Sequence, residues 1–128
     1  METKPIVKGR CHCACVEFEV KLPNGLESLS RCNCSMCSRR GAVVTFVPLG
    51  AFKITKGTSF LTLYEFNTNT AKHYFCSKCG IYTHHKRRSN PNEYAVNVAC
   101  IEGINPFELG DIATTDGINH SADRENDF

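Results

Sequence analysis

The placement of the cysteines constrains this chain more than any other feature of its sequence. The chain has nine cysteines in 128 residues, and seven of them fall into three short motifs: C-x-C (Cys11, Cys13), C-x-C-x-x-C (Cys32, Cys34, Cys37) and C-x-x-C (Cys76, Cys79). A disulfide across one intervening residue is badly strained, and an odd number of thiols cannot all be paired. The spacing therefore favours metal binding over a disulfide framework.

The composition is that of an ordinary globular domain. Hydrophobic residues make up 41% of the chain, charged residues 22%, and the net charge is +2, which is too small to indicate a nucleic-acid or membrane partner. No apolar run reaches membrane-spanning length, and the start "METKPIVKGR" lacks the apolar core of a signal peptide. We therefore expect a cytoplasmic protein, whose compartment keeps thiols reduced.

The rest of the chain predicts a mainly β fold. "VEFEV" (16–20) alternates apolar and acidic residues with the period of a half-buried strand. Further segments rich in β-branched and aromatic residues predict strands at 43–47, 52–55, 60–66, 71–75, 80–85 and 93–101. Only 35–42 and 105–110 have room for a short helical turn. We expect one domain over residues 1–110, and the polar segment 111–128 as a flexible C-terminal tail.

The first and third cysteine motifs together supply two thiolate pairs. A C-x-x-C followed by glycine, here Cys76, Cys79 and Gly80, is typical of a zinc knuckle, because the tight turn aims both thiolates at one ion. Two such pairs make a closed, tetrahedral, structural site on Cys11, Cys13, Cys76 and Cys79. The alternative is that these four are unrelated thiols.

The triplet Cys32, Cys34 and Cys37 is ambiguous on spacing alone. Three protein ligands leave a fourth position for water or substrate, which is how catalytic zinc differs from structural zinc. A fourth protein ligand would instead close the site, and the candidates are Cys15, His73, His84, His85 and Cys100.

Other chemistry-bearing residues have two interpretations each. Cys15 and Cys100 can be small buried apolar residues rather than ligands. The basic run 86–88 can be a solvated face, or it can hold the carboxylates of an acidic, peptide-like substrate. Arg39 and Arg40 follow the triplet directly and carry the same two interpretations.

Three stretches resemble a known family. "GRCHCACVEFEV", "RCNCSMCSRRGA" and "FCSKCGIY", in this order, resemble the glutathione-dependent formaldehyde-activating (Gfa-like) family. "YEFNTNTAKHYFC" and "RRSNPNEYAVNVAC" are most similar to its centromere protein V-like branch. The resemblance covers residues 6 to about 109.

The resemblance implies a fold, cofactors and an activity. The fold would be a zinc-clasped β-tent of several antiparallel sheets. One structural zinc would sit on Cys11, Cys13, Cys76 and Cys79, and a second, open zinc on the catalytic triplet Cys32, Cys34 and Cys37. The implied activity is that of a carbon–sulfur lyase, which joins a glutathione-like thiol to a small aldehyde or cleaves the S-hydroxymethyl adduct. Tyr82, Arg39 or Arg88 would then be candidates to orient the substrate.

One departure from the family pattern and one rival function follow from the same residues. The family usually has glycine after the first C-x-C, where this chain has Ala14 followed by an additional thiol, Cys15. The rival is a non-catalytic, zinc-stabilised thiol carrier or interaction module in which both metal sites are closed.

Overall fold

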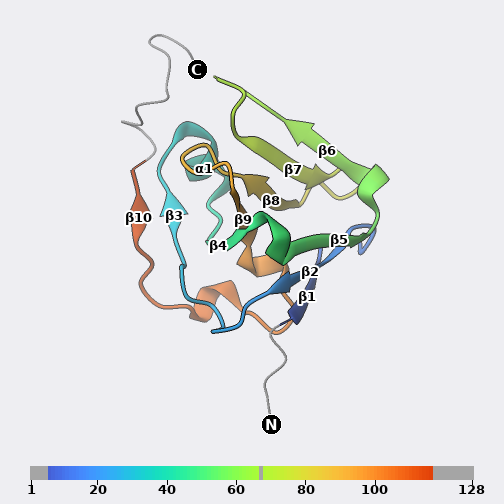
Figure 1. The fold of residues 1–128 in the computed structure, drawn as a ribbon, viewed down its shortest axis with the longest axis horizontal. Coiled ribbons are helices and arrows are strands. Elements are labelled where there is room, and N and C mark those ends of the chain that lie inside the picture. Colours follow the sequence, from blue (N-terminus) through green and yellow to red (C-terminus); the bar gives the residue numbers. More distant parts are fainter. Residues whose placement is uncertain (1–5, 67, 117–128) are drawn as a thin grey trace.

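The fold is mainly β, as the sequence predicts, and forms one small domain (Figure 1). The computed structural model describes residues 6–66 and 68–116. Within them, two antiparallel sheets account for most of the strands, and one short strand pair is parallel.

A three-stranded antiparallel sheet has the order β1-β2-β5, with bounds Ile6–Arg10, Glu17–Lys21 and Phe52–Lys56. The predicted alternation holds in β2: Phe18 and Val20 are each 1% exposed, whereas their acidic neighbours are half-buried. Residues 11–16, which connect β1 to β2, carry the first cysteine pair. The sheet therefore fixes both ends of this cysteine-bearing loop.

A five-stranded antiparallel sheet has the order β4-β9-β8-β7-β6. Its strands span Val44–Pro48, Glu93–Asn97, Tyr82–Lys86, Lys72–Cys76 and Leu61–Tyr64, respectively. β7 and β8 are neighbours in both the sequence and the sheet, and the C-x-x-C motif makes the turn between them. This turn lies near the loop between β1 and β2.

Two short elements carry the cysteine triplet. β3 (Arg31–Cys32) pairs in parallel with β10 (Thr114–Thr115), and α1 (Ser35–Arg40) follows β3 (Figure 1). β10 lies in the segment expected to be a tail; a flexible tail stays a prediction for residues 117–128, which are outside the described residues. Among the described residues, no helix has the length and apolar character needed to cross a membrane.

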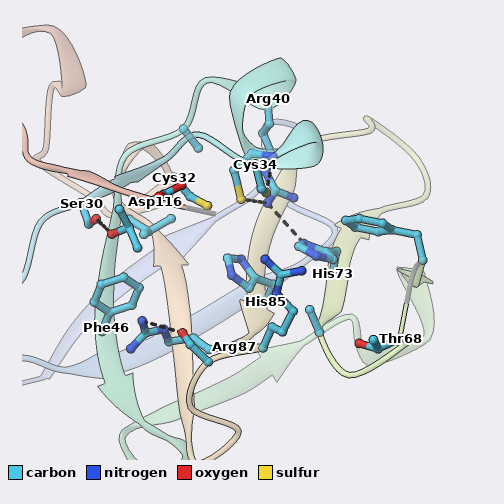
Figure 2. A pocket seen from close by; sticks show the side chains of 18 residues that line it. Ser30, Cys32, Cys34, Arg40, Phe46, Thr68, His73, His85, Arg87 and Asp116 are labelled. Carbon is cyan, nitrogen blue, oxygen red and sulfur yellow. Dashed lines mark hydrogen bonds between the residues drawn. The ribbon is translucent and has the colours of Figure 1, made fainter. Parts of the chain in front are cut away.

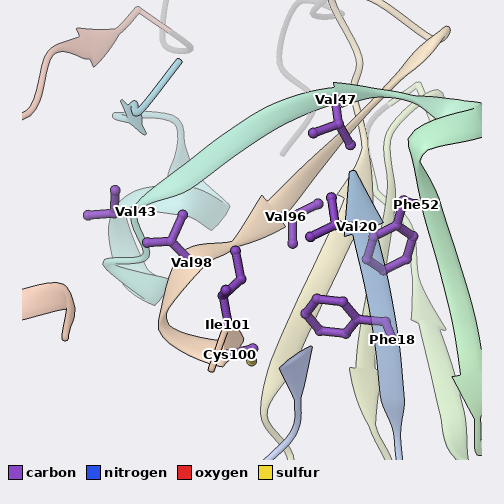
Figure 3. Close-up of a cluster of buried hydrophobic side chains, with 9 residues drawn as sticks. All are labelled: Phe18, Val20, Val43, Val47, Phe52, Val96, Val98, Cys100 and Ile101. Atoms are coloured by element: carbon purple, nitrogen blue, oxygen red, sulfur yellow. The ribbon is translucent and has the colours of Figure 1, made fainter. Parts of the chain in front are cut away.

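The main hydrophobic core joins the two larger sheets (Figure 3). It consists of buried apolar side chains from β2, β4, β5, β9, the 3₁₀ turn after β9 and the residues next to them: Phe18, Val20, Val43, Val47, Phe52, Val96, Val98, Cys100 and Ile101. Burying each large apolar side chain stabilises the fold by roughly 1.5–3 kcal/mol. This core packs the sheet that carries the β1–β2 loop against the sheet that carries the β7–β8 turn.

Candidate functional site

The structure brings together the four sulfur atoms of the first and third motifs. The Sγ atoms of Cys11, Cys13, Cys76 and Cys79 all lie within 4.8 Å of one another. Cys13 Sγ is 3.7 Å from both Cys11 Sγ and Cys76 Sγ. Cys11 and Cys76 are buried, and Cys13 is exposed. This group, called the Cys₄ cluster below, connects the β1–β2 loop to the β7–β8 turn and could hold a metal ion.

Backbone N–H groups point at two of these sulfur atoms. The Val16 amide donates to Cys11 Sγ at 3.4 Å, and the Lys78 amide donates to Cys76 Sγ at 3.4 Å. Gly80 has φ +79°, a conformation that a side chain disfavours, so the turn that aims Cys76 and Cys79 needs glycine there. Amide donors to sulfur favour the thiolate form, which is the form that binds metal.

The second group consists of the three sulfur atoms of the triplet. Cys32, at the end of β3, and Cys34 and Cys37, at the start of α1, place their Sγ atoms within 4.8 Å of one another. Cys34 is the N-cap of α1, and its Sγ accepts a hydrogen bond of 3.3 Å from the Cys37 amide. The short helix therefore turns Cys37 back towards Cys34.

The three thiols interact strongly with one another. Hydrogen bonds from Cys32 and Cys37 lower the pKa of Cys34, and the hydrogen bonds with Cys32 and Cys34 raise the pKa of Cys37. Three negative charges at this distance repel one another unless a cation lies among them. The donor set is therefore suited to a soft divalent metal such as zinc, which thiolates favour.

None of the five candidate fourth ligands joins the triplet within residues 6–66 and 68–116. Cys100 Sγ lies in the core, 3.5 Å from the carbonyl oxygen of Tyr82, and its burial raises the pKa of this thiol to about 12. Cys15 packs beside the Cys₄ cluster. His84 Nδ1 is 2.8 Å from Thr83 Oγ1. These three side chains are committed elsewhere in the fold.

The other two candidates, His73 and His85, line a cavity at the triplet (Figure 2). The cavity wall comes from the β3–α1 segment, from β4, β7 and β8, from the loops before β7 and after β8, and from β10. Its lining includes the triplet, Arg40, Ala42, Val44, Phe46, Phe66, His73, His85, Arg87, Arg88, Thr115 and Asp116. The triplet thus faces a hollow with apolar, imidazole and cationic walls.

Arg40 connects the triplet to this cavity. Its Nη2 donates to Cys37 Sγ at 3.4 Å and lies 3.2 Å from His73 Nδ1, and its guanidinium sits 3.5 Å above the ring of Tyr82. Arg39 is exposed and donates to the Ser35 carbonyl oxygen instead. From the sequence, both arginines were equal candidates for a role at the triplet. Because Arg40 follows Cys37 by three helical positions, it shares the face of α1 that carries Cys37. This spacing could have identified Arg40, rather than Arg39, as the arginine at the triplet.

Two residues of the half-buried basic run reach the cavity. Arg87 and Arg88 line the cavity, and Lys86 does not belong to its lining. The Arg87 guanidinium forms a 2.6 Å ion pair with Glu93 and lies 3.8 Å above the Phe46 ring. Phe46 was not singled out by the sequence, because a strand aromatic residue is more often part of the core.

Comparison with known proteins identifies the family. The family model described as glutathione-dependent formaldehyde-activating enzyme matches residues 6–112. The chain belongs to this family. The crystal structure of a Rhodobacter sphaeroides protein is also similar, with 56% sequence identity and a TM-score of 0.81. The match covers 84% of this chain and 99% of that one. Membership points to an activity that involves glutathione and formaldehyde.

Proposed function

We propose that this Gfa-family chain is a zinc-dependent carbon–sulfur lyase. Its reaction would join the thiol of glutathione, or of a similar compound, to a small aldehyde such as formaldehyde, and would cleave the S-hydroxymethyl adduct in reverse. The observation that carries this proposal is the triplet itself: three sulfur atoms face a cavity, and no fourth ligand from the described residues joins them. A site of this kind has room for a substrate sulfur or oxygen atom.

The proposal assigns two zinc ions to the chain. The Cys₄ cluster would hold a structural ion, since four thiolates complete a tetrahedral shell, and Cys32, Cys34 and Cys37 would hold the second. When bound at the triplet, zinc supplies a Lewis acid and a thiolate-binding ion. The triplet is therefore both the second metal site and the catalytic centre of the proposed enzyme.

The surrounding side chains would bind and orient the substrate. Arg40 holds a positive charge beside Cys37, and its stacking on Tyr82 fixes the direction of the guanidinium. Arg88 adds positive charge to the cavity, whereas the charge of Arg87 is balanced by its ion pair with Glu93; a cationic wall favours a thiol that carries carboxylates, as glutathione does. Phe46 and Phe66 supply apolar wall that limits the access of water.

The reaction balances without a redox cofactor. The thiolate sulfur bonds to the aldehyde carbon, the carbonyl π pair moves to oxygen, and that oxygen takes up one proton to become the hydroxyl of the adduct. Because the thiol released one proton on ionising, the net reaction is the addition of R–SH across C=O. The reverse reaction cleaves the same carbon–sulfur bond.

The direct test is the exchange of labelled formaldehyde. The zinc-loaded chain is mixed with glutathione and ¹³C-formaldehyde, and NMR exchange spectroscopy measures the rates of adduct formation and cleavage. Because the reaction also proceeds without enzyme, we expect a faster exchange than in buffer, and the acceleration should disappear in Cys32→Ala. Exchange at the buffer rate would contradict the enzyme proposal.

Cobalt substitution distinguishes the open site from the rival module. Glutathione should change the visible spectrum of cobalt at the triplet and leave that of the Cys₄ cluster unchanged. If glutathione perturbs neither site, both sites are closed, and the chain is a zinc-stabilised carrier or interaction module.

Two finer assignments are also proposals. Kinship with the centromere protein V-like branch is supported by the stretches at 64–76 and 87–100. A cytoplasmic location is supported by the nine cysteines, which are all free thiols and which a reducing compartment would preserve.

A further inference from the structure

Two histidine rings lie side by side in the cavity wall next to the triplet (Figure 2). His73 on β7 and His85 on β8 are direct partners in the sheet register, and their ring centroids are 4.6 Å apart. His73 is 4% exposed and His85 is half-buried. Each ring has one nitrogen held by a neighbouring side chain, and that contact determines which nitrogen carries the proton.

Arg40 fixes the tautomer of His73. The guanidinium Nη2 of Arg40 lies 3.2 Å from His73 Nδ1. A guanidinium only donates hydrogen bonds, so Nδ1 must accept, and the ring proton must be on Nε2. Stacking on Tyr82 and the hydrogen bond to Cys37 Sγ hold the guanidinium in this position.

Tyr82 fixes the tautomer of His85 in the same sense. Its hydroxyl oxygen is 2.6 Å from His85 Nδ1 and 3.5 Å from the Ala95 carbonyl oxygen, which is at the limit for a hydrogen bond. The hydroxyl therefore donates to Nδ1, and the proton of His85 is on Nε2.

The two Nε2 atoms are the ring nitrogens that no described side chain holds. Neither Nε2 atom forms a hydrogen bond with a described residue. Among the described residues, the side-chain nitrogen that is fully buried and has no hydrogen-bond partner is Arg40 Nε, so neither histidine Nε2 atom is both buried and unpartnered. The Nε2 atoms are therefore not sealed in the protein, and both side chains line the cavity. Burial, followed by the charge of Arg40, lowers the pKa of His73 to about 4, and burial also lowers the pKa of His85. Both rings are thus neutral donors near pH 7.

We propose that His73 and His85 form a paired donor site for the oxygen atom of the aldehyde or of the S-hydroxymethyl adduct. This inference rests on the proposed function and adds substrate-binding residues to it. As the carbon–sulfur bond forms and the π pair moves to oxygen, both Nε2–H groups donate to that oxygen and stabilise its negative charge, while the N–H bonds stay intact. The final proton of the adduct comes from the one released by the thiol.

NMR of the imidazole nitrogens tests the geometry without reference to activity. Long-range ¹H–¹⁵N correlation spectra of the zinc-loaded chain at pH 7 should show both histidines as neutral Nε2–H tautomers. Tyr82→Phe, which removes the hydroxyl donor, should change the tautomer balance of His85 and leave His73 unchanged. A charged ring, or an Nδ1–H tautomer at His73, would overturn the proposal.

Ligand binding tests the role of the donors. S-hydroxymethylglutathione and S-ethylglutathione have nearly the same shape and differ in one hydroxyl oxygen. His73→Ala and His85→Ala, each checked for zinc content and for a cooperative thermal transition, should weaken binding of the hydroxymethyl compound about tenfold and leave binding of the ethyl compound unchanged. His73→Gln, whose amide can reach the Nε2 position, should recover part of the loss.

Kinetics provide the second arm. Each alanine variant should lower kcat on the order of 10²-fold, the usual cost of removing one donor to a developing oxyanion, with KM for glutathione nearly unchanged. If the wild type binds the hydroxymethyl compound and accelerates exchange, and the variants match it in both, the histidine pair is refuted. If the wild type neither binds the adduct nor accelerates exchange, the proposed function itself is refuted.

Discussion

The sulfur atoms of Cys13 and Cys76 lie 3.7 Å apart, although 63 positions separate them in the sequence. Cys13 is on the loop between β1 and β2 of one sheet, and Cys76 ends β7 of the other. The main hydrophobic core also joins these two sheets, but it does so through different residues. A metal ion on the Cys₄ cluster would therefore be a second, independent connection between the sheets.

Cys76→Ser should abolish this connection. Cys76 is fully buried, and a hydroxyl is a much poorer zinc ligand than a thiolate. Because metal binding to a structural site is folding free energy, on the order of 10 kcal/mol, we expect loss of zinc and of the cooperative thermal transition. Circular dichroism and metal analysis measure both. Cys15→Ser, at a half-buried thiol outside both clusters, is the matched control and should retain both ions. An unchanged melting temperature in Cys76→Ser would show that the cluster is not a metal site.

Cys34→Ser should remove the triplet ion and leave the fold intact. Serine is a favoured N-cap residue, so the hydroxyl can accept from the Cys37 amide as Cys34 Sγ does now, and α1 should persist. We expect metal content to fall by about one ion per chain, since the Cys₄ cluster is independent of the triplet. Cys34→Ala is the control, because it loses the ligand and the helix cap together and should be less stable by roughly 1 kcal/mol. Global unfolding of Cys34→Ser would mark the triplet as structural.

Ala14→Gly should stabilise the chain. Ala14 has φ +66°, in the left-handed region that costs a residue with a Cβ atom roughly 1–2 kcal/mol. The family resemblance expects glycine at this position, and the backbone has kept the glycine conformation. Part of the gain is lost because glycine is more flexible in the unfolded chain, so we expect about 1 kcal/mol from denaturant unfolding. Ala51→Gly, in a 3₁₀ turn without positive φ, should destabilise instead. Equal effects of the two substitutions would contradict the strain at Ala14.

Cysteine spacing and strand patterns were sufficient to predict the mainly β fold and the two sulfur groups. These signals are local: Cys32 and Cys37 are five positions apart, and the alternation in β2 is visible within five residues. The assignment of the motifs to two sites also follows from chemistry, because two cysteine pairs supply the four ligands of a closed site, whereas the triplet supplies three ligands. The structure shows the sulfur atoms of each group within reach of one ion.

The cavity was not predictable, because it depends on contacts between distant elements. His73 meets Arg40 across 33 positions, and the hydrogen bond that orients it is visible only after β7 packs beside α1. β1, β3 and β10 were also missed. Residues 6–10 include Lys8, Gly9 and Arg10, which do not follow the pattern of a strand, and β10 has two residues and is held by β3 rather than by its own periodicity. These strands therefore form because they pair with other strands, not because of their own sequence pattern.

The buried histidine His84 should make the fold sensitive to acid. Its ring packs against Phe52 and Tyr74 at centroid distances of 4.4 and 4.7 Å, and burial lowers its pKa from 6.5 to about 3. Above pH 6.5 both the folded and unfolded states are neutral at this residue, so its contribution is fully present. As the pH falls below 6.5, the unfolded state takes up a proton that the folded state refuses, and stability is lost down to about pH 3.

The measurement is the free energy of unfolding of the wild type and of His84→Gln between pH 7 and about 5.5. We expect the wild type to lose up to about 1.4 kcal/mol more per pH unit than the variant once the pH is well below 6.5. His73 and His85 are present in both proteins, so most of their contribution cancels in the difference; a small part does not, because the charge of His84 also lowers the pKa of His85. Zinc content is measured at each pH, because loss of metal would add a second slope. Parallel pH profiles would show that His84 is not buried as a neutral ring.

The last prediction concerns β10, which begins just beyond the residues matched by the family model. β10 pairs in parallel with β3 and places Thr115 opposite Cys32. The Asn33 amide donates to the Thr115 carbonyl oxygen at 3.2 Å, and the Ser30 and Thr115 hydroxyl oxygens are 2.6 Å apart. β10 is thus the strand that supports the backbone of the first triplet ligand.

Removing residues 113–128 should therefore loosen the triplet and spare the Cys₄ cluster. Without β10, β3 loses its partner strand, and Cys32 is held less firmly, so we expect zinc affinity at the triplet to fall about tenfold, the lower end of what supporting residues contribute. The Cys₄ cluster and the main core make no use of residues 113–116, so the cooperative transition should persist. Removing residues 117–128 alone is the matched control, because β10 remains and the triplet should keep its affinity. Titration with a competing chelator measures both truncations against the full chain. If both truncations bind zinc equally well, β10 does not position Cys32, and the triplet is held by β3 and α1 alone.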